Sequence, residues 1–345
     1  MIDRILIVGL GSIGRRHLKI ARAQFPSADI RILRHTASKE FAVESNGNFF
    51  SLEQAVLFKP QVAVIANPSP NHLEIAHMMI DIGAHILIEK PISISVKGVS
   101  DLIHSANLAE LVVMTGYNLR YMKSLSKFRQ LLQKGEVGEV LSVRSEVGLD
   151  LRKWRQNVDY RESVSARHAL GGGVLLELSH ELDYLRWIFG EVDWVRATLI
   201  KQSNLDIDVE DTGHITLGFD TKASNKTLIA NLNIDMIRQD PVRTCVAIGE
   251  EGSLRWNGLT GVVEKFASNS QEWEILFKHD PNLDNTYKSE WDDFINSMKS
   301  GVLPLVTGMD GLKVLEIVEA IRCSATKGTQ TSVSGGVELF GNSRE

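Results

Sequence analysis

The sequence has few cysteines, little net charge and no long apolar run, and each shortage excludes a class of protein. Two cysteines in 345 residues, Cys245 and Cys323, form no CxxC pair, which argues against a disulfide framework and a cysteine-based zinc site. A net charge of −5 argues against a surface that coats nucleic acid. Because no apolar run reaches the roughly 18 residues of a transmembrane helix, we expect no membrane partner.

What remains is the composition of an ordinary globular protein. The chain is 43% hydrophobic and 23% charged, and its 345 residues predict about two domains. The short apolar run after residues 1–4 predicts a strand, because it is too short and too acidic at its front for a secretory signal. Two inert thiols and no signal predict a cytoplasmic protein.

A glycine motif follows that first strand. The β-branched run at residues 5–8 ends at the GxGxxG of Gly9, Gly11 and Gly14, and a segment of helical character follows. This is the context of a dinucleotide-binding turn, in which Gly9 permits the turn and Gly11 lets the backbone approach a pyrophosphate. Gly14 lets the helix pack close to the strand, and Ser12 and Ile13 offer N–H groups at the helix start. A merely glycine-rich turn is the alternative interpretation.

The end of the second strand, at residues 30–33, bears on the choice of cofactor. Where an NAD-binding domain places an acid for the ribose hydroxyl, this chain has Arg34, then His35, Thr36 and Ser38. An arginine fork suits a 2′-phosphate, so the sequence favours NADP(H) over NAD(H). A solvated Arg34 is the alternative.

Further strands alternate with helices over the first third of the chain. Apolar strands at 62–66, 84–88 and 111–114, with a helix at 73–82, predict a parallel, doubly wound sheet of the α/β class. Loops at the carboxyl ends of such strands bind ligands. Residues in the first two of these loops that we expect to contact the cofactor are Asn67, Pro68, Pro70, His72, Glu89 and Lys90.

The series GLGSIG, ANPSPNH, EKP and GYNLRY resembles the Gfo/Idh/MocA family, the glucose–fructose oxidoreductase and inositol dehydrogenase group. The resemblance implies a Rossmann domain over 1–120 and a substrate-binding and oligomerisation domain over 121–345. It gives Lys90 a contact with both nicotinamide and substrate, and it implies a cis Lys90–Pro91 bond. By the same resemblance, Tyr117, Asn118 and Arg120 lie in the substrate site.

The second part of the chain has a different hydrophobic pattern, with short strands of alternating apolar and polar residues. Alternating strands at 140–147, 195–199, 214–219, 228–234 and 244–248 predict an open, mainly antiparallel sheet of an α+β domain. Its uncovered face predicts a homodimer or homotetramer, and an amphipathic helix at about 309–325 is expected to pack back on the body.

The segment after Gly171-Gly172-Gly173 carries the candidate base. We predict one helix running to Ile188, entered through a flexible glycine segment, with Glu177, His180 and Asp183 spaced three apart on one face. A histidine flanked by carboxylates suits a general base, and the resemblance implies the same for His180. The family's acid lies at i−4 of that histidine, where this chain has Leu176. A solvated acid–histidine pair and a metal site at the three residues are the alternatives.

The loop at 150–162 is rich in arginine and aromatic residues. Trp154, Arg155 and Tyr160 suit an anionic or phosphate-bearing sugar, and an anchored surface loop is the alternative. The segment WR…DYRES before GGGVLL resembles bacterial members of surface-polysaccharide or sialic-acid-like sugar pathways. Together with Asp183 these residues complete the predicted substrate site. The histidines at 17, 77, 104, 214 and 279 have no convergent partner in the sequence.

The sequence thus predicts an NAD(P)-dependent oxidoreductase. Hydride would pass between nicotinamide C4 and a secondary hydroxyl or ketone of a sugar, cyclitol or nucleotide sugar, with Lys90, His180 and Glu177 as catalytic residues. Two alternatives stay open: a hydrolase or lyase of the same family with no net redox, and a catalytically silent NAD(P)-binding sensor.

Overall fold

The computed structural model describes residues 2–34, 42–154, 159–221 and 226–333, and the chain divides into two compact units. The first consists of Met1–Asn118 and Asp284–Leu315, and the second of Leu119–Leu283 and Glu316–Glu345. The predicted division at residues 120 and 121 did not give the segment 284–315 to the first unit. This segment belongs there because its apolar side chains, such as the fully buried Trp291 and Phe294, complete that unit's core.

The first unit is built on a six-stranded sheet in which every neighbouring pair is parallel, with the order β3-β2-β1-β4-β5-β6. The strands are β1 (Arg4–Val8), β2 (Asp29–Leu33), β3 (Gly47–Phe49), β4 (Val62–Ile65), β5 (His85–Glu89) and β6 (Val113–Gly116). The apolar runs of β1 and β4 are almost wholly buried, as expected for strands covered on both faces. The predicted parallel, doubly wound sheet is confirmed.

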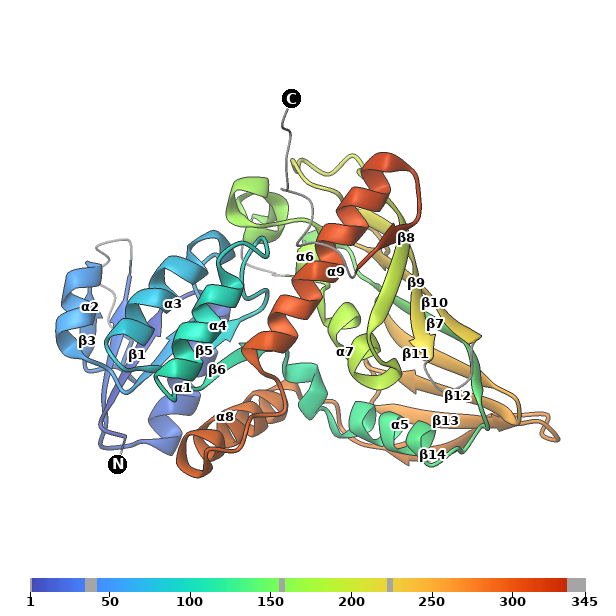
Figure 1. Ribbon diagram of the computed structural model, residues 1–345, viewed down its shortest axis with the longest axis horizontal. Coiled ribbons are helices and arrows are strands. Elements are labelled where there is room, and N and C mark those ends of the chain that lie inside the picture. The colour runs from blue at the N-terminus through green and yellow to red at the C-terminus, as the bar shows by residue number, and fades with distance from the viewer. Residues whose placement is uncertain (1, 35–41, 155–158, 222–225, 334–345) are drawn as a thin grey trace. The chain divides into compact units, whose positions relative to one another are not determined.

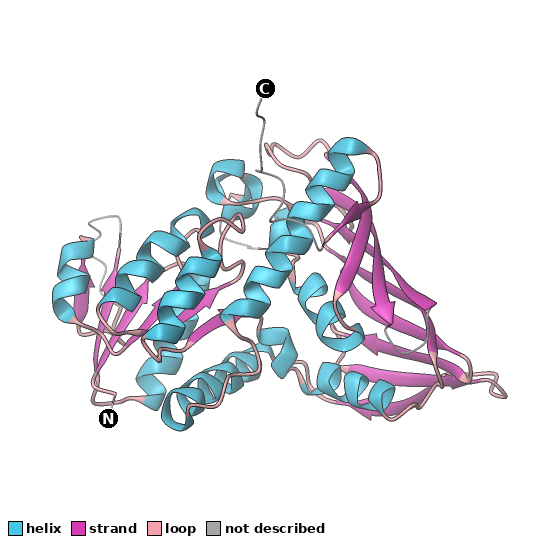
Figure 2. Ribbon diagram, in the orientation of Figure 1, coloured by secondary structure: helices cyan, strands magenta, loops and turns pink. Residues whose placement is uncertain are grey.

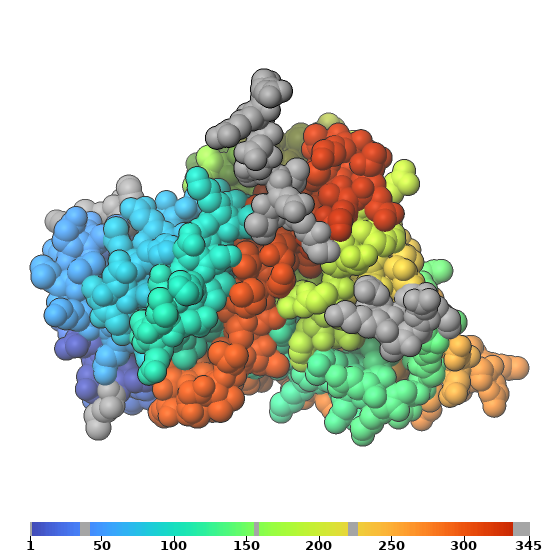
Figure 3. All heavy atoms as spheres, in the orientation of Figure 1, coloured from blue at the N-terminus to red at the C-terminus, as the bar shows by residue number. Residues whose placement is uncertain are grey.

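Helices follow the strands of this sheet. They are α1 (Ser12–Gln24), α2 (Leu52–Phe58), α3 (His72–Asp81), α4 (Val99–Leu108) and α8 (Leu283–Ser300), with a 3₁₀ turn η1 (Ser69–Asn71). Figure 1 shows α3 and α4 side by side across the strands, and their side chains close over the sheet in the space-filling view (Figure 3). The strand order reverses between β1 and β4, so the carboxyl ends of these two strands border the crevice where such sheets bind ligands.

The second unit is built on a nine-stranded sheet with the order β14-β13-β12-β11-β7-β10-β9-β8-β15. Among the strand pairs formed by the described residues, only β7–β10 is parallel, so the predicted open, mainly antiparallel sheet is confirmed. Its strands are β7 (Val140–Gly148), β8 (Val192–Ile200), β9 (Thr212–Thr221), β10 (Lys226–Asp235), β11 (Val242–Gly249), β12 (Gly252–Asn257), β13 (Val262–Ala267), β14 (Glu274–Lys278) and β15 (Thr331–Ser332).

Helices gather along one face of this sheet (Figure 2). They are α5 (Lys123–Gln133), α6 (Val174–Glu177), α7 (His180–Phe189) and the end of α9 (Gly308–Lys327). Short 3₁₀ turns are η2 (Asn118–Tyr121), η3 (Leu151–Lys153), η4 (Tyr160–Glu162), η5 (Val164–Ala166) and η6 (His168–Leu170). The opposite face carries polar cross-strand pairs, in which Thr216 donates to Asn231 at 3.1 Å and His214 contacts Asn233 at 2.8 Å. Its role as a subunit contact stays a prediction.

In the described ranges, no helix combines the length and the apolar character that a membrane span requires.

Candidate functional site

The glycine turn between β1 and α1 has the conformation that the sequence predicts. Gly9 has φ +87°, a left-handed conformation that favours glycine, and a Cβ there would lie 2.9 Å from the carbonyl oxygen of Ala66. A Cβ on Gly14 would lie 2.2 Å from the carbonyl oxygen of Gly9, so the first turn of α1 approaches β1 closely. Both positions therefore require glycine for steric reasons.

The start of α1 suits a bound phosphate. A Cβ built on Gly11 meets no atom within 4 Å, so this backbone faces open space, and Ser12 beside it is exposed. No side chain caps the helix, and its first turn contains no acid. The first N–H groups and the positive end of the helix dipole thus stay available for an anion. The residues present fit the pyrophosphate of a dinucleotide, with Ile13 half-buried behind the turn.

Arg34 directly follows β2, where the 2′ group of a bound dinucleotide would be selected. Its backbone N–H donates to the carbonyl oxygen of Phe49 at 3.0 Å, which ties this strand end to β3. His35 lies outside the described residues, as do Thr36 and Ser38. The preference for NADP(H) stays a prediction.

His72 joins the loops that follow β4 and β5. Its side chain is buried, with Nδ1 at 3.0 Å from the carbonyl oxygen of Pro91 and Nε2 at 2.8 Å from that of Asn67. The ring therefore positions two loops rather than presenting a nitrogen to a ligand. The Oδ1 atom of Asn67 is buried and has no hydrogen-bond partner among the described residues, so it suits a donor from a bound ligand. Pro68 and Pro70 are half-buried in the same loop.

Lys90 stands at the carboxyl end of β5, half-buried, and the Lys90–Pro91 bond is cis as the resemblance implied. Its backbone N–H donates to Oε2 of the preceding Glu89 at 3.2 Å. The other oxygen of Glu89 lies 2.8 Å from Nε2 of His17, and both side chains are buried. The sequence did not reveal the His17 contact because these residues are 72 positions apart.

The predicted single helix after the glycines is wrong. The structure has two helices, α6 ending at Glu177 and α7 beginning at His180, with Leu178 and Ser179 between them. The hydroxyl of Ser179 donates to the carbonyl oxygen of Leu176, and this local bond accompanies the break. Glu177 and His180 therefore do not share one face of a continuous helix, and their predicted partnership stays untested. Leu176, at the position of the family's acid, is buried.

Gly172 and Gly173 are close-packed rather than part of a flexible entry. A Cβ on Gly172 would lie 2.3 Å from the carbonyl oxygen of Val164, and one on Gly173 would lie 2.5 Å from the Glu210 carboxylate. Gly173 also has φ +106°. The same Glu210 carboxylate accepts a hydrogen bond from the N–H of Leu175 at 3.3 Å, so it satisfies the start of α6.

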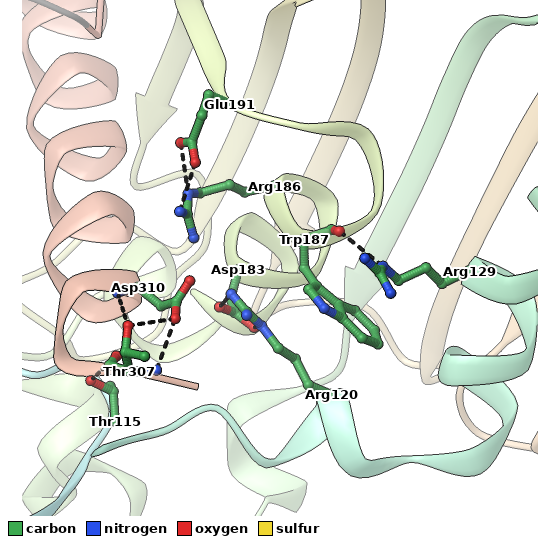
Figure 4. A network of polar contacts seen from close by, with 9 residues as sticks. All are labelled: Thr115, Arg120, Arg129, Asp183, Arg186, Trp187, Glu191, Thr307 and Asp310. Atoms are coloured by element: carbon green, nitrogen blue, oxygen red, sulfur yellow. Dashed lines mark hydrogen bonds and ion pairs between the residues drawn. The ribbon is translucent and has the colours of Figure 1, made fainter. Parts of the chain in front are cut away.

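His180 begins α7, half-buried, with its Nδ1 atom buried. One turn further, Asp183 accepts two hydrogen bonds from Arg120, at 2.9 Å and 2.6 Å, and this pair is almost wholly buried (Figure 4). Asp183 is thus committed to an arginine, which leaves little reason for a metal at Glu177, His180 and Asp183. The substrate-binding roles of Arg120 and Asp183 stay predictions, although only 3% and 1% of these side chains are exposed.

The other predicted substrate residues lie in varied surroundings. Tyr117 and Asn118 are buried, and the amide of Asn118 donates to Thr286 at 2.7 Å. Trp154 is half-buried, and its Nε1 has no hydrogen-bond partner in the described part of the chain. Tyr160 accepts a hydrogen bond from the N–H of Asp206 at 3.2 Å. Arg155 lies outside the described residues.

Comparison with known proteins covers both parts of the chain. The family model described as "Oxidoreductase family, NAD-binding Rossmann fold" matches residues 4–117, and the model of the GFO/IDH/MocA C-terminal domain matches residues 125–255. An uncharacterized oxidoreductase of Synechocystis sp. is 30% identical over 173 residues, which are 48% of this chain and 45% of that protein.

Two other relatives align over nearly their whole length. The myo-inositol 2-dehydrogenase of Thermotoga maritima is 25% identical over 329 residues, 90% of this chain and 93% of that protein. The WlbA dehydrogenase of Bordetella pertussis, solved with NADH and UDP-GlcNAcA, has a TM-score of 0.78 at 21% identity over 96% of this chain and 99% of that one, a likeness of fold. Since family models cover both units, the chain belongs to the Gfo/Idh/MocA family of oxidoreductases.

Proposed function

We propose that the protein is an NAD(P)-dependent dehydrogenase that oxidises a secondary hydroxyl, or reduces the corresponding ketone, of a sugar, cyclitol or nucleotide sugar. The glycine turn carries this proposal, because it joins a left-handed Gly9, an open approach at Gly11 and an uncapped α1 into a phosphate site. The names of the relatives support the substrate class: one is a myo-inositol dehydrogenase, and another was solved with a nucleotide sugar.

Three residues carry the chemistry in this proposal. A bound nicotinamide supplies the hydride acceptor or donor, and the protein supplies position and charge. Lys90, at the carboxyl end of β5, holds the reacting oxygen and stabilises negative charge that develops on it. His180 takes the hydroxyl proton during oxidation. Since its Nδ1 is buried, we assign the transfer to Nε2. Glu177 assists His180 by holding the imidazolium that forms.

For the cofactor we propose NADP(H) over NAD(H). Arg34 supports this, because it stands at the end of β2 in place of the acid that binds a 2′-hydroxyl. Loss of one charge-assisted hydrogen bond corresponds to about tenfold in affinity or more. Titrations of NADPH and NADH should therefore show that Arg34→Ala weakens only NADPH by about that factor. Equal weakening of both cofactors would contradict the 2′-phosphate contact.

The experiment that tests the function is a substrate screen. Sugars, cyclitols and nucleotide sugars are offered with NAD⁺ or NADP⁺, and the absorbance of the reduced nicotinamide is followed. Lys90→Met serves as the inactive control, and His180→Ala should lower kcat by about 10² or more. Full turnover in both variants would refute the assigned roles. Product formed without net reduced cofactor would instead support a hydrolase or lyase, and binding without any turnover would support a sensor.

A further inference from the structure

A buried chain of hydrogen bonds connects helix α8 to the end of β5 within the first unit. Trp291 on α8 and His17 on α1 are both fully buried. The indole Nε1 of Trp291 donates to Nδ1 of His17 at 2.9 Å, and Nε2 of His17 lies 2.8 Å from Oε1 of Glu89. The three side chains come from positions 17, 89 and 291, so their contacts could not be predicted from spacing in the sequence.

Trp291 determines which nitrogen of His17 carries the proton. An indole N–H is only a donor, so Nδ1 must offer a lone pair. The proton of the neutral ring then resides on Nε2, and His17 donates it to the Glu89 carboxylate. A second proton on Nδ1 would break the bond to Trp291. The histidine is therefore held as a neutral donor, and the contact with Glu89 is not an ion pair.

Glu89 connects the fixed His17 ring to the backbone of Lys90. Its Oε2 accepts the backbone N–H of Lys90 at 3.2 Å, and a Cβ on Gly116 would lie 3.0 Å from that oxygen. The Glu89 carboxylate is thus held in place by His17 on α1, by Gly116 on β6 and by the backbone of Lys90 at the end of β5. We propose that His17 and Trp291 are positioning residues for Lys90, acting through Glu89; this rests on the proposed role of Lys90.

Three further ionisable side chains, Arg16, Tyr287 and Glu290, lie around this chain of hydrogen bonds. The ring of Tyr287 faces His17 edge-on at 5.7 Å, and burial, together with the charges of Glu89 and Glu290, raises the pKa of its hydroxyl. Burial and the charges of Glu89 and Asp293 raise the pKa of Glu290 well above its ordinary value. Arg16, beside Tyr287, pairs with Asp284 at 2.9 Å.

The test combines spectroscopy with kinetics on the full-length protein. NMR of ¹⁵N-histidine should show His17 as the neutral Nε2–H tautomer through neutral pH, and Trp291→Phe should let the ring take a second proton. Trp273→Phe is the matched control, because that indole contacts Arg255 and not His17. An Nδ1–H tautomer in the unmodified protein would overturn the proposal even if no variant folds.

Kinetics separate positioning from a merely structural role. Trp291→Phe and His17→Leu should lower kcat by about tenfold or more while the cofactor Kd is kept, since misplacement of about 1 Å can cost more than that. His17→Gln, which retains an N–H donor toward Glu89, should recover part of the loss. Parallel losses of kcat and cofactor affinity in all variants would contradict the proposal. Turnover by a Lys90→Met variant would contradict the proposed function instead. The NMR result on the His17 tautomer would still stand, so the two failures can be distinguished.

A second inference rests on an independent feature, an open surface cavity of about 490 Å³ beside α5 in the second unit. Three cations, Lys123, Lys127 and Arg129, line it together with the aromatic rings of Tyr121, Trp187 and Phe277. No Asp or Glu is among its described lining residues, and α5 contains none over its eleven residues, although the whole chain has a net charge of −5. Lys123 and Lys127 are four apart, so their like charges repel across one helical turn.

Arg129 concentrates positive charge at this cavity. Its Nε donates to the carbonyl oxygen of Trp187 at 3.1 Å, and its guanidinium lies 4.6 Å from the centre of that indole. Arg120 lies 5.7 Å from the same ring, and burial together with the charge of Arg120 lowers the pKa of Arg129 (Figure 4). Asp183 balances Arg120, whereas an anion in the cavity would balance Arg129 and the two lysines.

We infer that this cavity binds a small organic phosphate. Its volume lies in the range of small-molecule sites and exceeds the size of inorganic phosphate, while lysine and arginine suit phosphate charge. Calorimetry with uridine diphosphate and with glucose 6-phosphate distinguishes a nucleotide from a sugar phosphate. Arg129→Gln and Lys127→Gln should each weaken binding by about tenfold, and Lys134→Gln, exposed directly after the last residue of α5, should not. Absence of binding, or equal binding in all variants, would overturn the inference.

Discussion

The buried pair of Arg120 and Asp183 should dominate the local stability around α7. The two side chains are 3% and 1% exposed and share two hydrogen bonds, so removing one charge leaves the other uncompensated in the protein interior. Breaking such a pair costs about 3–5 kcal/mol, against a total stability of about 5–15 kcal/mol for a typical protein. We therefore expect Asp183→Asn to lower the free energy of unfolding of the second unit by about 3 kcal/mol.

The same helix supplies a matched control. Arg186 on α7 pairs with Glu191 at 2.7 Å in the same bidentate way, but the Glu191 side chain is 66% exposed (Figure 4). An exposed pair contributes about 0–1 kcal/mol, so Glu191→Gln should hardly change stability. The double variant Arg120→Met/Asp183→Leu should recover much of the loss, because it leaves no buried charge behind.

Urea denaturation followed by far-ultraviolet circular dichroism measures these differences. The midpoint should fall far more for Asp183→Asn than for Glu191→Gln, with His180 displaced and turnover reduced in the first variant. Equal midpoints in the two variants would refute the reasoning. If Asp183→Asn instead raised KM at unchanged stability, the residue would be a substrate ligand, as the sequence alone predicted.

Four further predictions concern other parts of the chain. Because the pKa of Glu290 is raised by burial, by Glu89 and by Asp293, the folded state keeps a proton that the unfolded chain releases above its ordinary value of 4.5. Stability should therefore fall as pH rises above that value, and Glu290→Gln should be increasingly more stable than the unmodified protein in denaturation series at rising pH. Gly14→Ala should weaken cofactor binding by about tenfold or more in fluorescence titrations, since its Cβ would lie 2.2 Å from a carbonyl oxygen and such overpacking costs about 1–3 kcal/mol. Thiol reagents should modify Cys323 in the native protein and spare Cys245, whose pKa burial raises, as mass spectrometry would show. If the outer face of the second sheet joins subunits, Asn231→Arg should reduce the mass measured by light scattering, and an unchanged mass would exclude that face.

Much of the first unit could be predicted from sequence because its signals are local. Continuous apolar strands, the glycine turn and the strand-end loops each depend on neighbouring residues, and the structure places them in the predicted order. Two features were not predicted: β3, which has only three residues, and the place of segment 284–315 in the first unit, because that segment returns from the far end of the chain.

The candidate site was less predictable because its contacts are distant in sequence or depend on backbone detail. Spacing alone suggested one helix through Glu177 and His180, whereas a local bond from Ser179 accompanies a break between them. The partner of Asp183, at position 120, and that of His17, at position 291, follow only from the tertiary fold. The sequence predicted a flexible segment at the glycines 171–173, yet neighbouring backbone packs against Gly172 and the Glu210 carboxylate against Gly173.

The membership of Asp284–Leu315 in the first unit limits how the protein can be rebuilt. A chimera that transplants only residues 1–118 would omit the indole of Trp291, which donates to His17 on α1, and would expose apolar core. The nucleotide-binding unit is therefore not a single contiguous cassette, and an engineered exchange of cofactor specificity has to carry both stretches of chain or re-create the missing helix in the recipient.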